Sequence, residues 1–257
     1  MVNLRKNFWP LALGLISSVF FLFIVRYQNR LGFFVALFLW LAVLIFVALK
    51  PRPARVERRA ILPILLATVL AFVSLGSILE WMILNYFFTG LIGLEVMLLF
   101  QSVSGQGDFW RLSQKPYRRI MVLIWSFNVF SFITTIFALS LFFPGIPFWL
   151  LTIIGGFIFG FISVMIWRMY FQLRPEQGLA WIFLMAFLMM ELIWVMHFLP
   201  FGYLVSGFFL TWIWYVLQLL ARFHFAATGI VWRRQILFLA INAILFFLIL
   251  LFFVRWV

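Results

Sequence analysis

Four ionisable residues lie inside otherwise apolar stretches of the sequence: Glu80, Glu95, Glu191 and His197. A charged side chain at the centre of a bilayer costs about 2.5–3.5 kcal/mol on insertion scales, so such residues normally face a bundle interior or water and mark function. Carboxylates and imidazoles take up and release protons, and carboxylates bind cations. The four residues are therefore candidates for an ion- or substrate-binding site.

Glu80 and Glu191 are predicted to act as a pair. Each is an acidic residue followed by an aromatic-rich segment and a glycine-containing turn. Counting back from these turns, each glutamate lies about eight residues, roughly 12 Å along a helix, inside the outer half of the membrane. The two glutamates would occupy equivalent places in two repeats of an internally duplicated chain, for which the evidence follows below. There they would bind a proton or a cation near a central cavity, with His197 or Asn85 assisting.

The alternative is a packing role, in which each carboxyl group is protonated or hydrogen-bonded and holds helices together. This alternative is stronger for Glu95, because the sequence defines its span poorly. For His197, an interfacial ring hydrogen-bonded to the turn or to head groups is the more frequent role. Asn128 and Asn242 are expected to form hydrogen bonds between helices.

Motifs that would indicate an enzyme are absent from the sequence. It contains no HExxH metalloprotease helix, no GxSxG nucleophile elbow and no phosphate-binding P-loop. The lack of cysteine excludes disulfides, Cys-ligated zinc and thiol catalysis. Asp108 is the single acidic residue of its loop, and one carboxylate supplies too few ligands for a metal site. We expect no metal and no cofactor, and an enzyme is the less favoured class.

The elements that position these residues must be transmembrane helices. The 257 residues are 67% hydrophobic and only 10% charged, whereas about 25% of residues are charged in soluble domains. Apolar runs long enough to cross a bilayer recur from end to end, and no polar segment could fold separately. The sequence predicts a single all-α integral membrane domain over residues 1–257, a polytopic helical bundle.

The apolar runs predict about nine transmembrane helices. Residues 61–101 contain no Lys or Arg, so we place the hairpin of this region near Phe88 to Gly90, where glycine permits a tight turn. The fourth span is then short. The predicted spans are 8–25, 31–49, 61–87, 90–104, 120–142, 146–170, 179–198, 203–221 and 236–254.

Basic residues set the predicted orientation, because cytoplasmic loops of membrane proteins are rich in Lys and Arg. All of the 19 basic residues except Arg26, Arg30 and Arg255 fall on the side of the N-terminus. We therefore expect a multi-pass protein of the cell membrane with a cytoplasmic N-terminus and an external C-terminus. No small-residue cleavage site precedes Arg26, so the first span is expected to be retained. The +13 net charge then reflects topology and contact with anionic head groups, and no nucleic-acid partner is predicted.

The sequence also shows signs of an internal duplication. A basic pair leads into an apolar helix at Arg5-Lys6, at Arg118-Arg119 and at Arg233-Arg234. We predict one repeat at 5–117, a second at 118–232 and an extra C-terminal helix at 233–257. Four spans per repeat would give both repeats the same orientation in the membrane, a 4 + 4 + 1 arrangement.

One stretch resembles a known group of proteins. Residues 198–207, FLPFGYLVSG, are similar to a segment of uncharacterised multi-pass membrane proteins of candidate-phyla bacteria. The resemblance covers one turn and part of a span, and it implies a membrane protein without any activity or site residue.

Three functions stay open at this point. The first is a small-solute or proton-coupled transporter that uses matched intramembrane glutamates. The second is a non-catalytic packing or anchoring subunit of a membrane complex, which would bind another membrane protein or a second copy of the chain. The third is an intramembrane enzyme that modifies lipid, which has acid-base groups but lacks a nucleophile.

Overall fold

The computed structural model describes residues 4–26, 29–49, 55–103, 115–171, 175–225 and 232–253. The described residues form α-helices and no strand, which confirms the predicted all-helical class. The helices are α1 (Leu4–Arg26), α2 (Arg30–Leu49), α3 (Arg55–Ile78), α4 (Met82–Val103), α5 (Lys115–Phe142), α6 (Phe148–Arg168), α7 (Pro175–His197), α8 (Tyr203–Phe225) and α9 (Trp232–Phe253).

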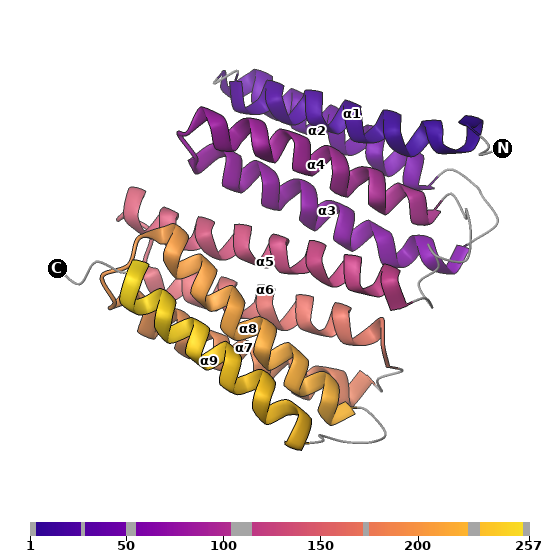
Figure 1. Ribbon diagram of the computed structural model, residues 1–257. Helices are drawn as coiled ribbons and strands as arrows, with labels where there is room; N and C mark the ends of the chain where they lie inside the picture. The colour runs from indigo at the N-terminus through magenta and orange to yellow at the C-terminus, as the bar shows by residue number, and fades with distance from the viewer. Residues whose placement is uncertain are drawn as a thin grey trace. The chain divides into compact units, whose positions relative to one another are not determined.

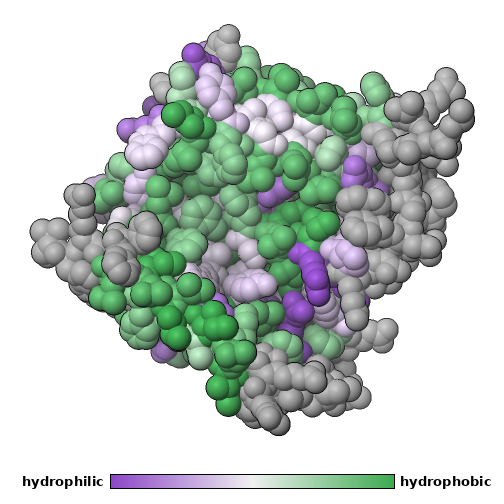
Figure 2. Space-filling view, in the orientation of Figure 1, coloured by the Kyte–Doolittle hydropathy of each residue, from purple (hydrophilic) through white to green (hydrophobic). Residues whose placement is uncertain are grey.

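The helices have the length and surface of membrane spans. Within the described residues, α1 to α8 each contain a stretch apolar enough to cross a bilayer, and α9 contains a shorter one, Ile236–Ile249. The face in Figure 2 is largely hydrophobic, with few polar patches. On α2, only a narrow stripe of Ala36, Trp40, Leu44 and Ala48 is buried, while Phe38 is 72% exposed. Such a surface is stable against lipid chains, so the polytopic membrane bundle is confirmed.

The chain divides into two compact units, residues 1–135 and residues 136–257. Unit 1 contains α1 to α4 and most of α5, and unit 2 contains the end of α5 and α6 to α9. The predicted repeats at 5–117 and 118–232 stay a prediction.

In unit 1, α1 packs most extensively against α4, which lies beside it in Figure 1. The two backbones approach closely at Gly14 and Gly93: a Cβ atom on Gly14 would lie 2.5 Å from the carbonyl oxygen of Gly93. One turn further along α1, the Ser18 hydroxyl donates a hydrogen bond of 2.7 Å to the Thr89 carbonyl of α4. Small residues drive helix association in membranes because they allow such close contact.

In unit 2, α6 and α7 form the corresponding close pair. A Cβ atom on Gly160 would lie 2.8 Å from the Ile182 carbonyl oxygen, and one on Gly156 would lie 2.7 Å from that of Ala186. Glycine at these two positions is therefore required by packing rather than by backbone conformation.

Each unit also contains a buried tryptophan that is hydrogen-bonded to a serine of another helix. In unit 1, the Trp40 indole N–H of α2 donates to the Ser17 hydroxyl of α1 at 3.1 Å. In unit 2, the Trp214 indole N–H of α8 donates to the Ser163 hydroxyl of α6 at 2.9 Å. All four side chains are buried, so each bond satisfies an indole N–H that no water reaches.

We expect Ser163→Ala to lower the free energy of unfolding by about 1–2 kcal/mol, because the Trp214 N–H would stay buried without an acceptor. The measurement is the unfolding midpoint of purified protein in detergent. Ser140→Ala is the matched control, since the Ser140 hydroxyl donates only within its own helix, to the Phe137 carbonyl. Equal midpoints for the two variants would contradict the expectation.

The boundary between the third and fourth spans differs from the prediction. α3 ends at Ile78 and α4 begins at Met82, so the predicted hairpin at Phe88 to Gly90 is wrong. These residues are helical within α4, which has 22 residues and is not short. The turn is fixed by a side chain instead: the Asn85 amide donates to the Leu79 carbonyl at 3.0 Å, which satisfies an acceptor left open at the end of α3.

Candidate functional site

Glu95 lies on the face of α4 that is turned away from α1. The opposite face carries Gly93, which meets Gly14 of α1. Two residues along a helix correspond to a rotation of about 200°. Glu95 is nevertheless only 5% exposed, so other residues cover it on that face.

Aromatic residues on the same face of α4 as Glu95 contact α3 and α5. Phe88 lies about two turns before Glu95 and shares its face. The ring of Phe88 packs against Phe72 of α3, with centroids 6.2 Å apart, and against Phe127 of α5, with centroids 5.8 Å apart. Glu95 therefore faces the side of unit 1 that α3 and α5 occupy.

A buried polar pair joins α3 and α5 near this place. The Asn128 amide of α5 donates a hydrogen bond of 3.0 Å to the Thr68 hydroxyl of α3. Both residues are fully buried. This bond confirms the prediction that Asn128 links helices.

This pair lies at a level along the helix axes similar to that of Glu95. Thr68 lies one turn before Phe72 on α3, and α4 runs opposite to α3, so Thr68 and Glu95 lie on the same side of the phenylalanine contact. Thr68 is about one turn from that contact and Glu95 about two turns, which separates them by roughly one turn along the axis. We call Glu95, Asn128 and Thr68 the Glu95 cluster.

The Glu95 cluster contains acceptor atoms that the described residues leave without a partner. They are Oε2 of Glu95 and Oδ1 of Asn128, both buried. An unpaired buried acceptor costs about 1–3 kcal/mol, so each of these oxygens would gain from a proton donor or a small cation. The described residues contain no group of three His, Cys, Asp or Glu side chains that could hold a metal ion.

Glu80 lies outside the helices. It belongs to the connection between α3 and α4 and is exposed. The prediction that it lies about eight residues inside a span is therefore wrong. A carboxylate at the end of a span reaches water or head groups, which removes the cost of burial.

Glu191 and His197 lie on α7, as predicted. Glu191 is exposed, as are Trp194 and Val195 on the same side of the helix. The His197 ring stacks on Phe148, with centroids 3.8 Å apart and planes 16° apart. His197 is the last residue of α7, and its predicted interfacial role stays a prediction. Glu80 and Glu191 belong to different units.

The remaining candidate, Asn85, has a structural contact at the turn before α4. Its side-chain amide donates to the Leu79 carbonyl. The backbone carbonyl of Asn85 accepts a 2.7 Å hydrogen bond from the Thr89 hydroxyl. Asn242 also bonds as predicted: its side-chain oxygen accepts from the Trp212 indole N–H at 2.9 Å, between α8 and α9.

Several buried polar residues were not among the predicted candidates, and two of them are Thr68 and Gln218. Gln218 of α8 is only 3% exposed, and neither polar atom of its amide has a partner among the described residues. An amide inside an apolar span was the available signal for Gln218. Thr68 gave no signal, because threonine occurs in spans as a residue that bonds its own helix.

Comparison of the chain with protein-family models, with curated proteins and with solved structures gives no match. The assignment of function therefore depends on the geometry of the Glu95 cluster and on the membrane architecture.

Proposed function

We propose that the protein is a proton-coupled or small-solute transporter of the cell membrane, and that Glu95 takes up and releases the proton. The observation that carries the proposal is a carboxyl group that is 5% exposed in a membrane span, with one oxygen unpartnered in the described structure. The distribution of Lys and Arg supports a cytoplasmic N-terminus and an external C-terminus, with the basic loops against anionic head groups.

A buried carboxyl group suits this task because its two protonation states differ in what they require. The neutral form is stable in an apolar interior, and the ionised form needs water, a cation or hydrogen-bond donors. Asn128 offers an amide oxygen to the protonated acid, and it is tied to Thr68 of a third helix. Loss of the proton would therefore favour a helix arrangement that admits water, which couples protonation to movement.

Cysteine labelling tests whether water reaches the Glu95 cluster, since the chain contains no native cysteine. Glu95→Cys is labelled in intact membranes with a water-soluble maleimide applied to each side. We expect modification of Glu95→Cys from at least one side, because a transport site must exchange its proton with water. Val69→Cys is the buried control, since Val69 is fully buried on α3.

Gly145→Cys, in the exposed connection between α5 and α6, shows that each sample is inserted and reactive. Labelling of Gly145→Cys together with protection of Glu95→Cys from both sides would reject the transport proposal. The Glu95 cluster would then be a packing device.

Glu191 supports the second candidate, a packing or anchoring subunit of a membrane complex. It is an exposed carboxylate on a span whose neighbouring side chains are apolar and exposed. None of the described side chains donates a hydrogen bond to it, and contact with lipid chains would be costly. A partner membrane protein with a donor at this depth would remove that cost. Loss of a co-purifying protein on Glu191→Leu would favour this candidate.

A further inference from the structure

We propose that the groove between α7 and α8 binds one acyl chain of an anionic phospholipid, with the head group at the basic end of the groove. The groove belongs to unit 2 and has a volume of about 230 Å³. It is a binding site for a lipid molecule and is separate from the Glu95 cluster of unit 1.

Both α7 and α8 pack against α6, and they also contact each other. α7 packs on α6 through the glycine contacts of Gly156 and Gly160. α8 is fixed to α6 by the hydrogen bond from Trp214 to Ser163. The groove lies between α7 and α8 and is lined over about two turns of each helix.

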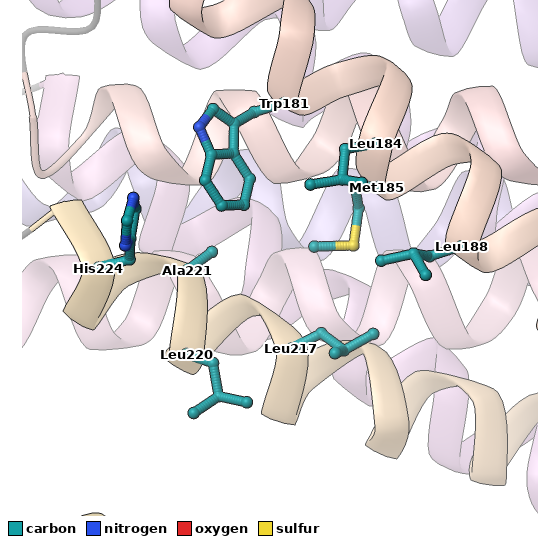
Figure 3. Close-up of a pocket in the computed structure, with 8 residues that line it drawn as sticks. All are labelled: Trp181, Leu184, Met185, Leu188, Leu217, Leu220, Ala221 and His224. Carbon is teal, nitrogen blue, oxygen red and sulfur yellow. The ribbon is translucent and has the colours of Figure 1, made fainter. Parts of the chain in front are cut away.

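The lining of the groove is suited to a hydrocarbon chain. Figure 3 shows the lining side chains of the two helices, which are mostly apolar, with ring nitrogens on Trp181 and His224. Leu184 is 47% exposed and Leu188 37% exposed, so the groove is open along its side. The lining residues are Trp181, Leu184, Met185 and Leu188 of α7 and Leu217, Leu220, Ala221 and His224 of α8.

The groove runs from the end of the two spans toward the membrane interior. Trp181 is near the start of the α7 span Gly178–His197, and His224 is near the end of the α8 span Tyr203–Phe225. Leu188 and Leu217 lie at the other end, roughly 10 Å deeper along the helices. A lipid that stands in the bilayer has the same arrangement, with the head group at the surface and the chain pointing inward.

Positive charge lies at the surface end of the groove. Arg222 is in the last turn of α8, where its guanidinium lies 4.0 Å from the centre of the Tyr170 ring. Arg168, exposed in the last turn of α6, belongs to the same end, because α6 and α8 run in the same direction. Glu176, in the first turn of α7, is the one acidic side chain described there. The excess of arginine favours a phosphate head group.

Photo-crosslinking of the full chain in phosphatidylcholine vesicles tests the proposal. The probe is phosphatidylglycerol with a diazirine in one acyl chain, and adducts are located by peptide mass spectrometry. We expect adducts to concentrate on residues 184–188 and 217–221. Unlabelled phosphatidylglycerol should lower their yield about tenfold at a level where phosphatidylethanolamine has little effect, a preference equivalent to 1.4 kcal/mol.

Two substitutions distinguish binding of the acyl chain from recognition of the head group. Ala221→Phe fills the groove and should remove the adducts, whereas Ala42→Phe, at an exposed position of α2, should leave them unchanged. Arg222→Gln should retain the adducts but lose the advantage of phosphatidylglycerol over phosphatidylethanolamine. If Ala221→Phe lowers the unfolding midpoint, Leu217→Phe fills the groove from its half-buried rim and decides the question.

Several results would overturn the proposal. One is an even spread of adducts over exposed apolar residues such as Phe38. Another is equal competition by the two unlabelled lipids, which would indicate ordinary bilayer lipid. A third is an unchanged yield when a folded variant fills the groove.

Discussion

Replacement of Glu95 by glutamine is expected to abolish proton flux while the protein stays folded. Glutamine has nearly the same shape as glutamate and is also polar, but it cannot release a proton at any relevant pH. The purified protein is reconstituted in vesicles that contain a pH-sensitive dye, and a potassium diffusion potential drives proton entry. The rate should fall to that of empty vesicles, a loss of at least about tenfold, or 1.4 kcal/mol in the barrier.

Glu80→Gln and Glu191→Gln are the matched controls, because each removes one carboxylate from an exposed position. We expect both variants to retain flux. Loss of flux in these two variants, with flux retained in Glu95→Gln, would instead favour the glutamate pair predicted from the sequence. Wild-type flux no faster than that of empty vesicles would contradict proton transport itself, and a similar unfolding midpoint for all variants excludes misfolding.

Replacement of Gly14 by leucine is expected to separate α1 from α4. The nearest atom to a Cβ on Gly14 is the Gly93 carbonyl oxygen at 2.5 Å, and a backbone atom inside a helix cannot move aside as a side chain can. Overpacking of this kind costs typically 1–3 kcal/mol and more where the backbone is involved. We expect a loss of at least about 3 kcal/mol, seen as a lowered unfolding midpoint.

Gly90→Leu provides the control for this substitution. Gly90 lies in the same unit on α4, but a Cβ atom there would have no heavy atom within 4 Å. Leucine is a better helix former than glycine, so Gly90→Leu should be neutral or slightly stabilising. If both variants unfold at the wild-type midpoint, the close contact between α1 and α4 is not a source of stability.

Hydropathy was sufficient to predict the class of the fold and most span positions. Spans such as 8–25 and 31–49 agree with α1 and α2 to within a few residues, because each is bounded by charged or polar residues that cannot enter lipid. The predicted boundary between α3 and α4 was wrong because residues 61–101 lack the basic residues that mark a loop. The hairpin was therefore placed at a glycine. Glu80 was the better marker, since a carboxylate is stable at the end of a span.

The Glu95 cluster could be predicted only in part. Glu95 and Asn128 were candidates because polar side chains are rare in spans. Which face of α4 is turned away from α1 decides where Glu95 lies, and this follows from the contact of Gly93 with Gly14 on the other side of α4. A contact between residues as far apart in the chain as Gly14 and Gly93 leaves no periodic signal in a single sequence.

The pairing of α1 with α4 also sets an order of events during biosynthesis. A ribosome that adds about 5–20 residues per second needs roughly 4–16 s to proceed from Gly14 to Gly93. Until then, the glycine face of α1 has lipid or the insertion machinery as its neighbour, although α2 has already been made. α6 and α7 are consecutive helices, so they can pack against each other as soon as both have been synthesised. α1 therefore reaches its final contacts only after α2, α3 and α4 have been made.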